Sequence, residues 1–308
     1  MKRYILSLNI VFWSISICIS TAQSWRFRVL YPDASNLAEY QFLNSDTSIS
    51  IYTSNLSNGT QSMLIRDLDP ESGTLLWNSL YTPTGVRSFR IDYSLRTTPS
   101  ILFCDAHTGN VPGKYYQKID FNTNAAISHF SGFIQTVNGI KLINDKVYFI
   151  GELSGGGTSN WTRKAQVLSL DTLDFQMRDS FTIRSSQNRS DPDFILQDIV
   201  DYDSETLLLL IHENTGPIYF QSLDPDQVTL LWIDKQDGHV VRRRNYPTID
   251  FVPQLIQKLS DGSGYAIFGY RMYLRSFYSS VPGVFKVDNQ GDSLSFHIGP
   301  YTDANHPD

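Results

Sequence analysis

Apolar residues in this chain recur at every second position or in short unbroken runs, and both patterns predict β-strands. Helix periodicity is nearly absent. β-branched and aromatic residues gather in runs bounded by Gly, Asn, Asp, Ser and Pro, as in the predicted hairpins Ser62–Leu68 with Leu75–Tyr81 and Val228–Ile233 with Val240–Tyr246. We therefore expect an all-β protein.

Two kinds of hairpin alternate along the chain. One kind is apolar at almost every position and should be buried on both faces; Leu207–Ile211, Val147–Ile150 and Ala266–Phe268 are examples. The other kind alternates polar with apolar residues, as in Val240–Tyr246, and should lie further out, where Arg243 would tolerate replacement. One hairpin of each kind gives a four-stranded antiparallel sheet of about fifty residues, which is a β-propeller blade with its inner strands first.

A repeated turn indicates the same architecture. The segment LDPESGTLLW, Leu68–Trp77, has the pattern of a strand end, a turn and a returning strand, and related segments follow at intervals of about fifty to sixty residues. Each copy is anchored by an aspartate: Asp69, Asp120, Asp171, Asp234 and Asp288. Five blades fit this period within a single propeller domain over 23–308, at approximately 39–81, 88–130, 139–183, 194–246 and 254–298, and they could be part of a larger ring.

The repeated aspartate is interpreted as a turn residue. Asp caps backbone N–H groups in tight turns, and Gly73, Gly238 and Gly291 supply the left-handed residue that a short hairpin requires. The second and third copies have NTN (122–124) and TLD (172–174) where glycine is expected. A calcium loop would need several more oxygen ligands at fixed positions, so no metal is expected here.

These repeats resemble two groups of known propellers. LDPESGTLLW resembles the repeat of pyrroloquinoline-quinone-like propellers, in which Asp, Gly and Trp recur in each blade. LSDGSGYAIFGYRM followed by FKVDNQGDSLSFHIG is similar to the secreted propeller repeats of Bacteroidota surface proteins. The resemblance covers nearly all of 23–308 and implies a propeller and an exported protein, but no particular activity. The tryptophan is kept only at Trp77, which speaks against a quinone cofactor, so no cofactor is expected.

Residues 1–22 are predicted to be a signal peptide. Lys2 and Arg3 precede a largely apolar run, and small residues lead to a cleavage position after Ala22. A membrane anchor is the alternative, but polar residues interrupt a run that is already short for a span. We therefore expect no stable membrane span after cleavage, and a protein that is secreted or held in the cell envelope, in the periplasm or at the outer surface.

The net charge limits the possible partners. The formal net charge is −6, and cleavage after Ala22 would remove Lys2, Arg3 and no acid, which changes it to −8. This balance argues against nucleic acid or an anionic membrane as partner.

After cleavage Cys104 would be the single cysteine, unable to form an internal disulfide, and its apolar surroundings predict a buried thiol.

No catalytic motif is found in the sequence. The six histidines include no pair at metal-ligand spacing, and there is no nucleophile elbow, phosphate loop or HExxH helix. Strand alternation puts Arg243 opposite Arg242 and Arg244, so these arginines form no basic patch. A glycosidase would need two carboxylates that converge in space, which stays open at this point. The densest acidic group is interpreted as solvated: Asp191, Asp193, Asp198, Asp201, Asp203 and Glu205.

The candidate binding residues lie in the long connections. In an antiparallel blade, the first-to-second and third-to-fourth turns fall on one face, and the longer connections fall on the other, where rigid scaffolds usually carry binding residues. Two long connections contain aromatic residues with arginines nearby: Tyr219, Phe220, Arg271, Tyr273, Arg275, Phe277 and Tyr278. The alternative is that these rings cover the ends of the inner strands.

These observations favour an exported, non-enzymatic binding or scaffold module at the cell surface or envelope. Its partner would be an unknown glycan or an envelope protein. The alternatives are a secreted carbohydrate-active enzyme with acids contributed from several blades, and an assembly factor of the envelope.

Overall fold

The computed structural model describes the chain in segments: residues 8–11, 24–27, 40–45, 48–57, 60–69, 74–81, 89–98, 100–108, 114–131, 136–154, 163–183, 193–214, 227–247, 251–272 and 280–299. The chain divides into two compact units, Met1–Phe89 and Arg90–Asp308. Every regular element in the described segments is a β-strand, and these segments hold no helix long and apolar enough to cross a membrane.

The first unit contains two sheets. β1 (Leu8–Val11) pairs antiparallel with β2 (Ser24–Phe27). β1 lies within the segment predicted to be a signal peptide, and cleavage of that segment stays a prediction. The second sheet, blade 1, contains β3 (Tyr40–Ser45), β4 (Ser48–Ser57), β5 (Thr60–Leu68) and β6 (Leu75–Tyr81) in that order.

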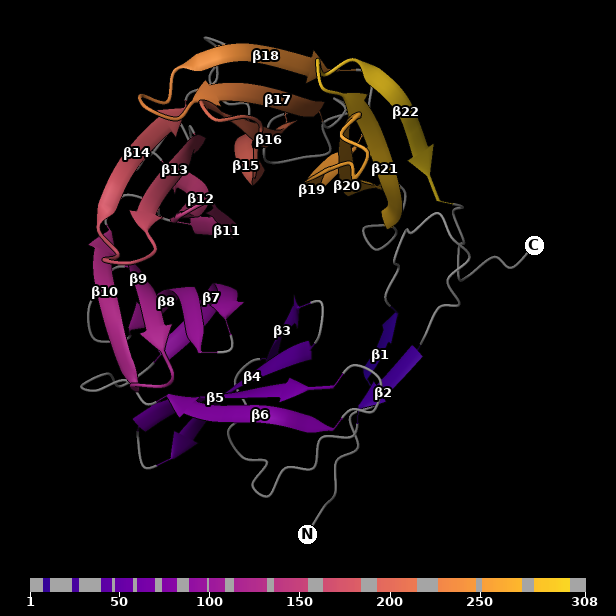
Figure 1. Ribbon diagram of the computed structural model, residues 1–308. Coiled ribbons are helices and arrows are strands. Elements are labelled where there is room, and N and C mark those ends of the chain that lie inside the picture. Colours follow the sequence, from indigo (N-terminus) through magenta and orange to yellow (C-terminus); the bar gives the residue numbers. More distant parts are fainter. Residues whose placement is uncertain are drawn as a thin grey trace. The chain divides into compact units, whose positions relative to one another are not determined.

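The second unit contains four four-stranded antiparallel sheets, each in chain order from its first strand to its fourth (Figure 1). Blade 2 has β7 (Phe89–Thr98), β8 (Ile101–Thr108), β9 (Lys114–Asp120) and β10 (Ala125–Ser131). Blade 3 has β11 (Thr136–Ile143), β12 (Lys146–Ser154), β13 (Arg163–Asp171) and β14 (Met177–Ile183). Blade 4 has β15 (Asp193–Asp201), β16 (Thr206–Asn214), β17 (Gln227–Asp234) and β18 (Val240–Tyr246). Blade 5 has β19 (Val252–Lys258), β20 (Gly264–Met272), β21 (Ser280–Asp288) and β22 (Ser293–Ile298).

The predicted fold class is confirmed. The protein is all-β and is built from the four-stranded antiparallel blades of a β-propeller, five of them in the described residues. The order of strands follows the order of the chain in each blade, as expected when every strand is joined to its neighbour by a direct antiparallel connection.

Successive blades of the second unit pack face to face. Because side chains alternate along a strand, β16 sends Leu207, Leu209 and Ile211 toward blade 3 and Leu208 and Leu210 toward blade 5. The same alternation joins blade 2 to blade 3, where the Tyr116 and Phe149 ring centroids are 4.3 Å apart. The core is therefore a series of apolar layers between sheets.

Burial follows the middle of each sheet more than its inner half. Leu207–Ile211 and Val147–Ile150 are buried as predicted, and Phe268 is half-buried. Val228–Ile233, expected to lie in a wetter outer hairpin, is equally buried, and β18 beside it is mostly exposed. The reason is geometric: a middle strand has a bonded strand on both sides and a neighbouring sheet on both faces, whereas first and fourth strands lie at sheet edges.

The turn role of the repeated aspartates is confirmed. Asp171 Oδ1 accepts the Leu173 amide at 2.8 Å, and Asp234 and Asp288 accept the amides two residues on at 2.7 and 2.8 Å. Asp120 makes the same contact at 2.9 Å. Asp69 closes its hairpin through a backbone bond from its own amide to the Thr74 carbonyl, at 2.8 Å.

A left-handed residue follows these aspartates, as a tight hairpin requires. Gly238 and Gly291 have φ of +72° and +76°, and Gly73 lies outside the described residues. In the two copies without glycine, Asn124 and Phe175 take the position, with φ of +51° and +57°. Asparagine tolerates this conformation, but a bulky residue there is unusual. Phe175 is held because its ring is buried between Phe103 and Phe149.

Candidate ligand-binding site

The predicted binding residues lie almost wholly outside the described residues. Tyr219 and Phe220 fall in 215–226, and Tyr273, Arg275, Phe277 and Tyr278 fall in 273–279. Arg271 is described: it lies in β20, opposite Val281 of β21, and is half-buried. The aromatic site stays a prediction. The described residues show parts of the two ends of the blades.

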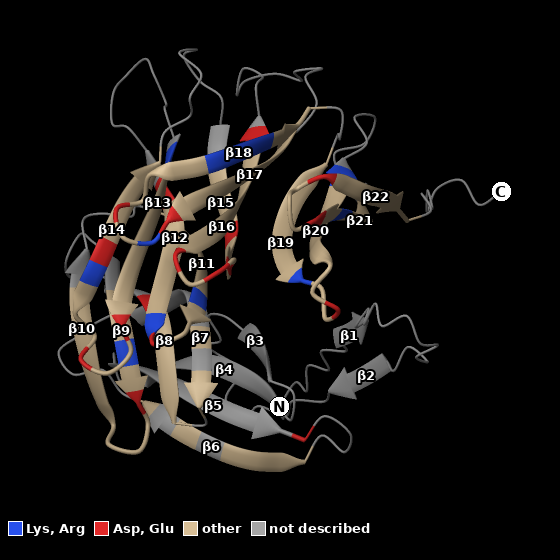
Figure 2. Ribbon diagram, turned by 45° about the horizontal axis from the view of Figure 1, so that its top comes forward, with Lys and Arg blue, Asp and Glu red and all other residues tan. Residues whose placement is uncertain are grey.

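At one end of blades 2 to 5 the two tight turns are bonded to each other. The residue after the repeated aspartate donates its amide to the neighbouring turn: Phe121 to Ser100, Thr172 to Asp145, and Lys235 to Glu205, at 2.8–2.9 Å. In blade 5 the side-chain amide of Asn289 replaces this bond and donates to the Gly262 carbonyl at 2.8 Å. Both sets of tight turns therefore lie at the same end of these blades, as predicted. Acidic residues occur at several of these turns (Figure 2).

The same end also joins neighbouring blades. Lys118 of β9 donates to the Thr172 and Leu173 carbonyls of the blade 3 turn, and Tyr246 of β18 donates to the Gly291 carbonyl of the blade 5 turn. Gly238 packs against the Phe181 ring of blade 3. Each of these third-to-fourth turns therefore rests on the outer strands of the preceding blade.

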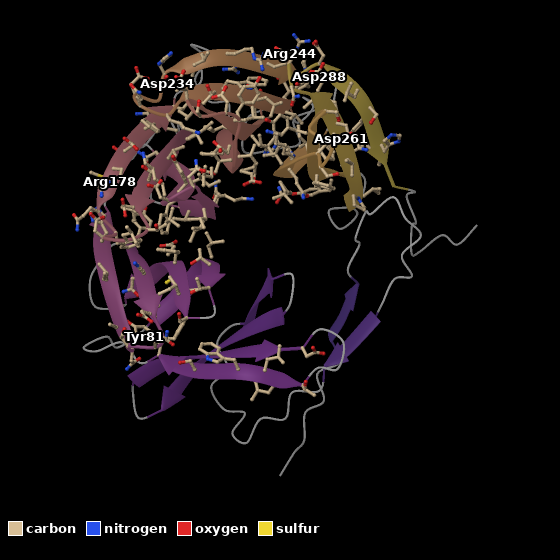
Figure 3. The ribbon with its side chains drawn as sticks, in the orientation of Figure 1. Tyr81, Arg178, Asp234, Arg244, Asp261 and Asp288 are labelled. Atoms are coloured by element: carbon tan, nitrogen blue, oxygen red, sulfur yellow. The ribbon has the colours of Figure 1, made fainter. Side chains whose placement is uncertain are left out.

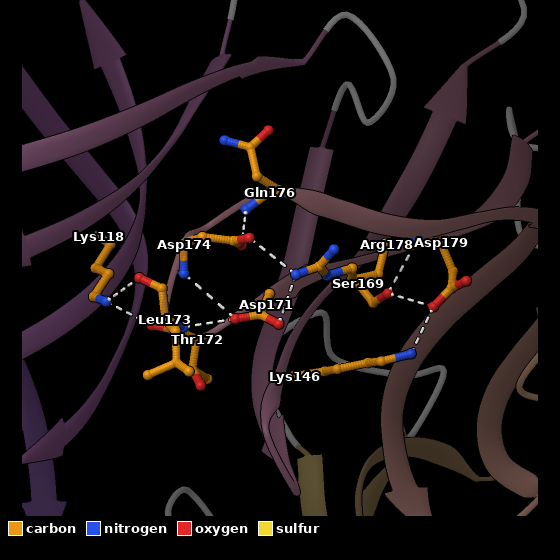
Figure 4. A network of polar contacts seen from close by, with 10 residues as sticks. All are labelled: Lys118, Lys146, Ser169, Asp171, Thr172, Leu173, Asp174, Gln176, Arg178 and Asp179. Atoms are coloured by element: carbon orange, nitrogen blue, oxygen red, sulfur yellow. Dashed lines mark hydrogen bonds and ion pairs between the residues drawn. The ribbon is translucent and has the colours of Figure 1, made fainter.

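The blade 3 turn is the most heavily bonded part of this end (Figure 4). A guanidinium nitrogen of Arg178 lies 3.0 Å from Asp171 Oδ2 and 2.9 Å from Asp174 Oδ2. Nearby, Asp179 accepts from both Ser169 and Lys146 at 2.9 Å. The amide bond from Leu173 and the guanidinium bond both lower the pKa of Asp171. These groups are occupied with one another, which indicates a structural role.

The corresponding turn of blade 4 brings together Asp234, Asp237 and His239, whose ligand atoms lie within 4.8 Å of one another. Asp234 Oδ1 already accepts the Gln236 amide at 2.7 Å, and the His239 ring nitrogen lies 2.6 Å from Asp237 Oδ1. The contact with Asp237 raises the pKa of His239. The cluster is exposed and its carboxylates serve the turn, so its geometry is accounted for without a metal.

At the opposite end, blade 4 buries a charged group that the sequence did not reveal. Glu213, one residue before the end of β16, is fully buried and forms an ion pair with Arg243 of β18. Burial raises the pKa of Glu213, while Arg243 and a hydrogen bond with Thr229 act in the opposite direction. One carboxylate oxygen, Oε2, has no hydrogen-bond partner within the described part of the chain.

Polar pairs recur between the third and fourth strands, toward this end in blades 3 and 4 and at mid-strand in blade 2. Gln117 Nε2 donates to Ser128 Oγ at 3.0 Å in blade 2, and Gln166 Nε2 donates to Thr182 Oγ1 at 3.3 Å in blade 3. Thr229 Oγ1 donates to Asn245 Oδ1 at 3.3 Å in blade 4. In blades 3 and 4 the third strands thus change from an apolar middle to a polar end where the long connections start.

The first strands are linked sideways by Asp198. Its Oδ1 lies 3.1 Å from Lys141 Nζ of β11, and its Oδ2 accepts the Ile256 amide of β19 at 3.0 Å. Asp198 is 2% exposed, so its interpretation as a solvated acid was wrong. Burial raises the pKa of Asp198 against the effect of Lys141 and two backbone amides. Asp203 and Glu205 of the same acidic group are exposed, as expected.

The arginines of β18 alternate as predicted and are all engaged. Arg242 stacks on Trp232, 3.6 Å from the ring centroid, and donates to Gln290 at 2.8 Å. Arg244 pairs with Asp292 of the same blade 5 turn, and both Arg244 and Asp288 are labelled in Figure 3. Arg243 faces the other way and pairs with Glu213. The expectation that Arg243 tolerates replacement stays untested, and the ion pair with a buried acid argues against it.

Comparisons with known proteins give distant structural similarities alone. No family model matches the chain, and no curated protein matches it. Similar solved structures include the β-propeller domain of the Trilobed protease from Pyrococcus furiosus (10% identity, TM-score 0.45, 84% of this chain and 70% of that chain). Others are oligogalacturonate lyase from Vibrio parahaemolyticus (10%, 0.42, 86% and 74%) and an ACO/RPE65 chimera (9%, 0.45, 82% and 58%). The chain spans less than two thirds of that chimera.

These scores are too low to carry an argument about function. None of the comparisons bears on the resemblance to pyrroloquinoline-quinone-like or Bacteroidota repeats, which stays a prediction. Cys104 is buried as expected, and burial raises the pKa of its thiol, which disfavours a nucleophilic role.

Proposed function

We propose that this protein is an exported β-propeller binding module that holds a glycan or an envelope protein at the end of the blades where the long connections lie. One observation carries the proposal: the turn end is bonded to itself and to the preceding blade, through Lys118, Lys235 and Asn289 among others. Because the polar groups of the described turns already bond to other parts of the protein, few of them remain for a ligand. The opposite end has the longer connections, including 215–226 and 273–279, and the arginine Arg271.

The test is a double variant, Tyr273→Ala with Tyr278→Ala. We expect it to fold, as judged by circular dichroism, and to lose binding to a panel of oligosaccharides and envelope proteins. Leu173→Ala is the matched control, because Leu173 is 83% exposed at the tip of a tight turn. This variant should bind like the natural protein. Binding that survives in the folded double variant would place the site elsewhere.

A secreted carbohydrate-active enzyme is the second candidate, and the buried acids favour it. Glu152, Asp198 and Glu213 come from blades 3 and 4, and the pKa of both Asp198 and Glu213 is raised. A raised pKa suits a general acid, but each of these carboxylates also has a bonded partner. Cleavage of an oligosaccharide by the natural protein that disappears in Glu213→Gln would favour the enzyme over the binding module.

A further inference from the structure

The first strands of blades 3, 4 and 5 share an irregularity. In each, the pairing with the second strand skips one residue: between Val137 and Gly139, between Leu196 and Asp198, and between Pro253 and Leu255. The extra residues are Asn138, Gln197 and Gln254. A β-bulge re-aims the side chain that it carries, and bulges gather next to functional sites. The same bulge in three consecutive blades carries a side-chain amide each time.

The residues that carry these amides lie in one row across neighbouring strands. β15 contacts β11 on one side and β19 on the other, and Figure 1 shows the three strands on the side of their sheets away from β14, β18 and β22. Asn138 Nδ2 donates to the Leu196 carbonyl at 3.0 Å, directly beside Gln197. The Asp198 contact with the Ile256 amide holds the next pair of strands at the level of Gln197 and Gln254. The bulges of β11 and β19 lie near the ends that the long connections enter, and the bulge of β15 lies at mid-strand.

The fold uses these amides unequally. Asn138 Nδ2 also donates to Glu152 at 3.1 Å, which fixes its side chain between blades. Gln254 is exposed, and its Nε2 donates only to the adjacent Pro253 carbonyl among the described residues. The half-buried Gln197 has no hydrogen-bond partner for its amide within the described segments. A structural role accounts for Asn138 but leaves Gln197 and most of Gln254 unexplained.

We infer that this row of bulge amides binds the hydroxyl groups of a neutral carbohydrate, an inference that rests on the proposed binding function. An amide offers a donor and an acceptor together, which matches a hydroxyl group that both donates and accepts. Leu255, 39% exposed beside Gln254, gives the row an apolar surface for the C–H face of a sugar ring. A peptide added to a sheet would need contacts along one strand, whereas these amides lie across three strands. The net charge of −6 disfavours an acidic polysaccharide.

The test is binding of neutral hexose, pentose and N-acetylhexosamine oligosaccharides, first on an array and then by titration calorimetry. We expect Gln197→Ala and Gln254→Ala each to weaken binding about five- to tenfold, and more in combination, with an unchanged melting temperature. Gln257→Ala is the control, since Gln257 is an exposed amide on the same strand, nearer the tight turn, and should bind normally.

The outcomes separate this inference from the proposed function. Oligosaccharide binding that persists in the combined variant, or binding by the natural protein to peptides or envelope proteins alone, overturns the amide row and leaves the binding module standing. A natural protein that binds neither oligosaccharides nor envelope proteins overturns both. Oligosaccharide binding that is lost with the Gln197 amide supports both.

Discussion

The ring of Phe175 stacks on that of Phe103, with centroids 5.8 Å apart, while the Phe175 backbone has a φ of +57°. In the corresponding turns of blades 4 and 5, Gly238 and Gly291 also have a positive φ. Each packs against an aromatic side chain of the preceding blade, Phe181 for Gly238 and Trp232 for Gly291. In blade 3 the turn supplies the ring itself. These three blade junctions thus share one arrangement, in which an aromatic side chain lies beside a left-handed turn residue. The aromatic residue belongs to the preceding blade in two of them and to the turn itself in blade 3.

This arrangement predicts an unusual order of stabilities at Phe175. Removal of the buried ring by Phe175→Ala should lower the free energy of unfolding by about 3–5 kcal/mol. Phe175→Gly removes the same ring but adopts the positive φ freely, so it should be more stable than the alanine variant by about 0.5–1 kcal/mol. Urea denaturation of both variants measures this. An alanine variant more stable than the glycine variant would show that φ at this position is not left-handed.

Gly291→Ala should be much more harmful than Gly262→Ala. Both glycines have a positive φ, +76° and +71°, but a Cβ on Gly291 would lie 2.7 Å from the Trp232 ring, whereas one on Gly262 would meet nothing within 4 Å. We expect a loss of about 2–4 kcal/mol for Gly291→Ala, from strain and overpacking, and about 1 kcal/mol for Gly262→Ala, from strain alone. Equal losses in melting experiments would contradict docking of this turn on blade 4.

Leu209→Asp should prevent folding. Leu209 is fully buried in β16, in the cluster between blades 3 and 4, so the variant buries a charge with no partner. Val241→Asp is the control, because Val241 is 57% exposed in the outermost strand β18 of the same blade, and should shift the melting temperature little. An unchanged melting temperature for Leu209→Asp would show that β16 is not a central strand.

The buried ion pair of Glu213 predicts a pH dependence of stability. Because its pKa is raised in the folded protein, the proton on Glu213 stabilises the fold below the unfolded pKa of about 4.3, and this contribution is lost as the pH rises through the folded pKa. A glutamine side chain does not titrate, so the natural protein is compared with the Glu213→Gln variant. The free energy of unfolding of the natural protein minus that of the variant should fall as the pH rises from about 4. A difference that rises with pH would mean that Arg243 outweighs burial.

The blades were predictable because their signals are local. An aspartate that caps a turn, a glycine with positive φ and a short apolar run each occur within a few residues, so the hairpins follow from the sequence. The burial of Asp198 depends on Lys141 and Ile256, which lie in two other blades. The Glu213–Arg243 pair joins residues of β16 and β18, with the whole of β17 between them. Such partners are set by the packing of sheets, which no single segment encodes.

The strand bulges illustrate the same limit at the candidate site. Asn138, Gln197 and Gln254 each stand two residues before an isoleucine, but this short pattern does not show that the pairing skips them. The aromatic residues of the long connections were found from connection length, and their role stays a prediction.

Amide hydrogen exchange of the protein, with and without a bound oligosaccharide from the array, tests the central claim most directly. We predict that binding protects backbone amides of β11, β15 and β19 near Asn138, Gln197 and Gln254 and in the long connections 215–226 and 273–279. The tight turns at 172–176, 235–238 and 289–291 should exchange at the same rate in both states. Protection confined to those turns, or no oligosaccharide that binds at all, would contradict a carbohydrate site at the long-connection end of the blades.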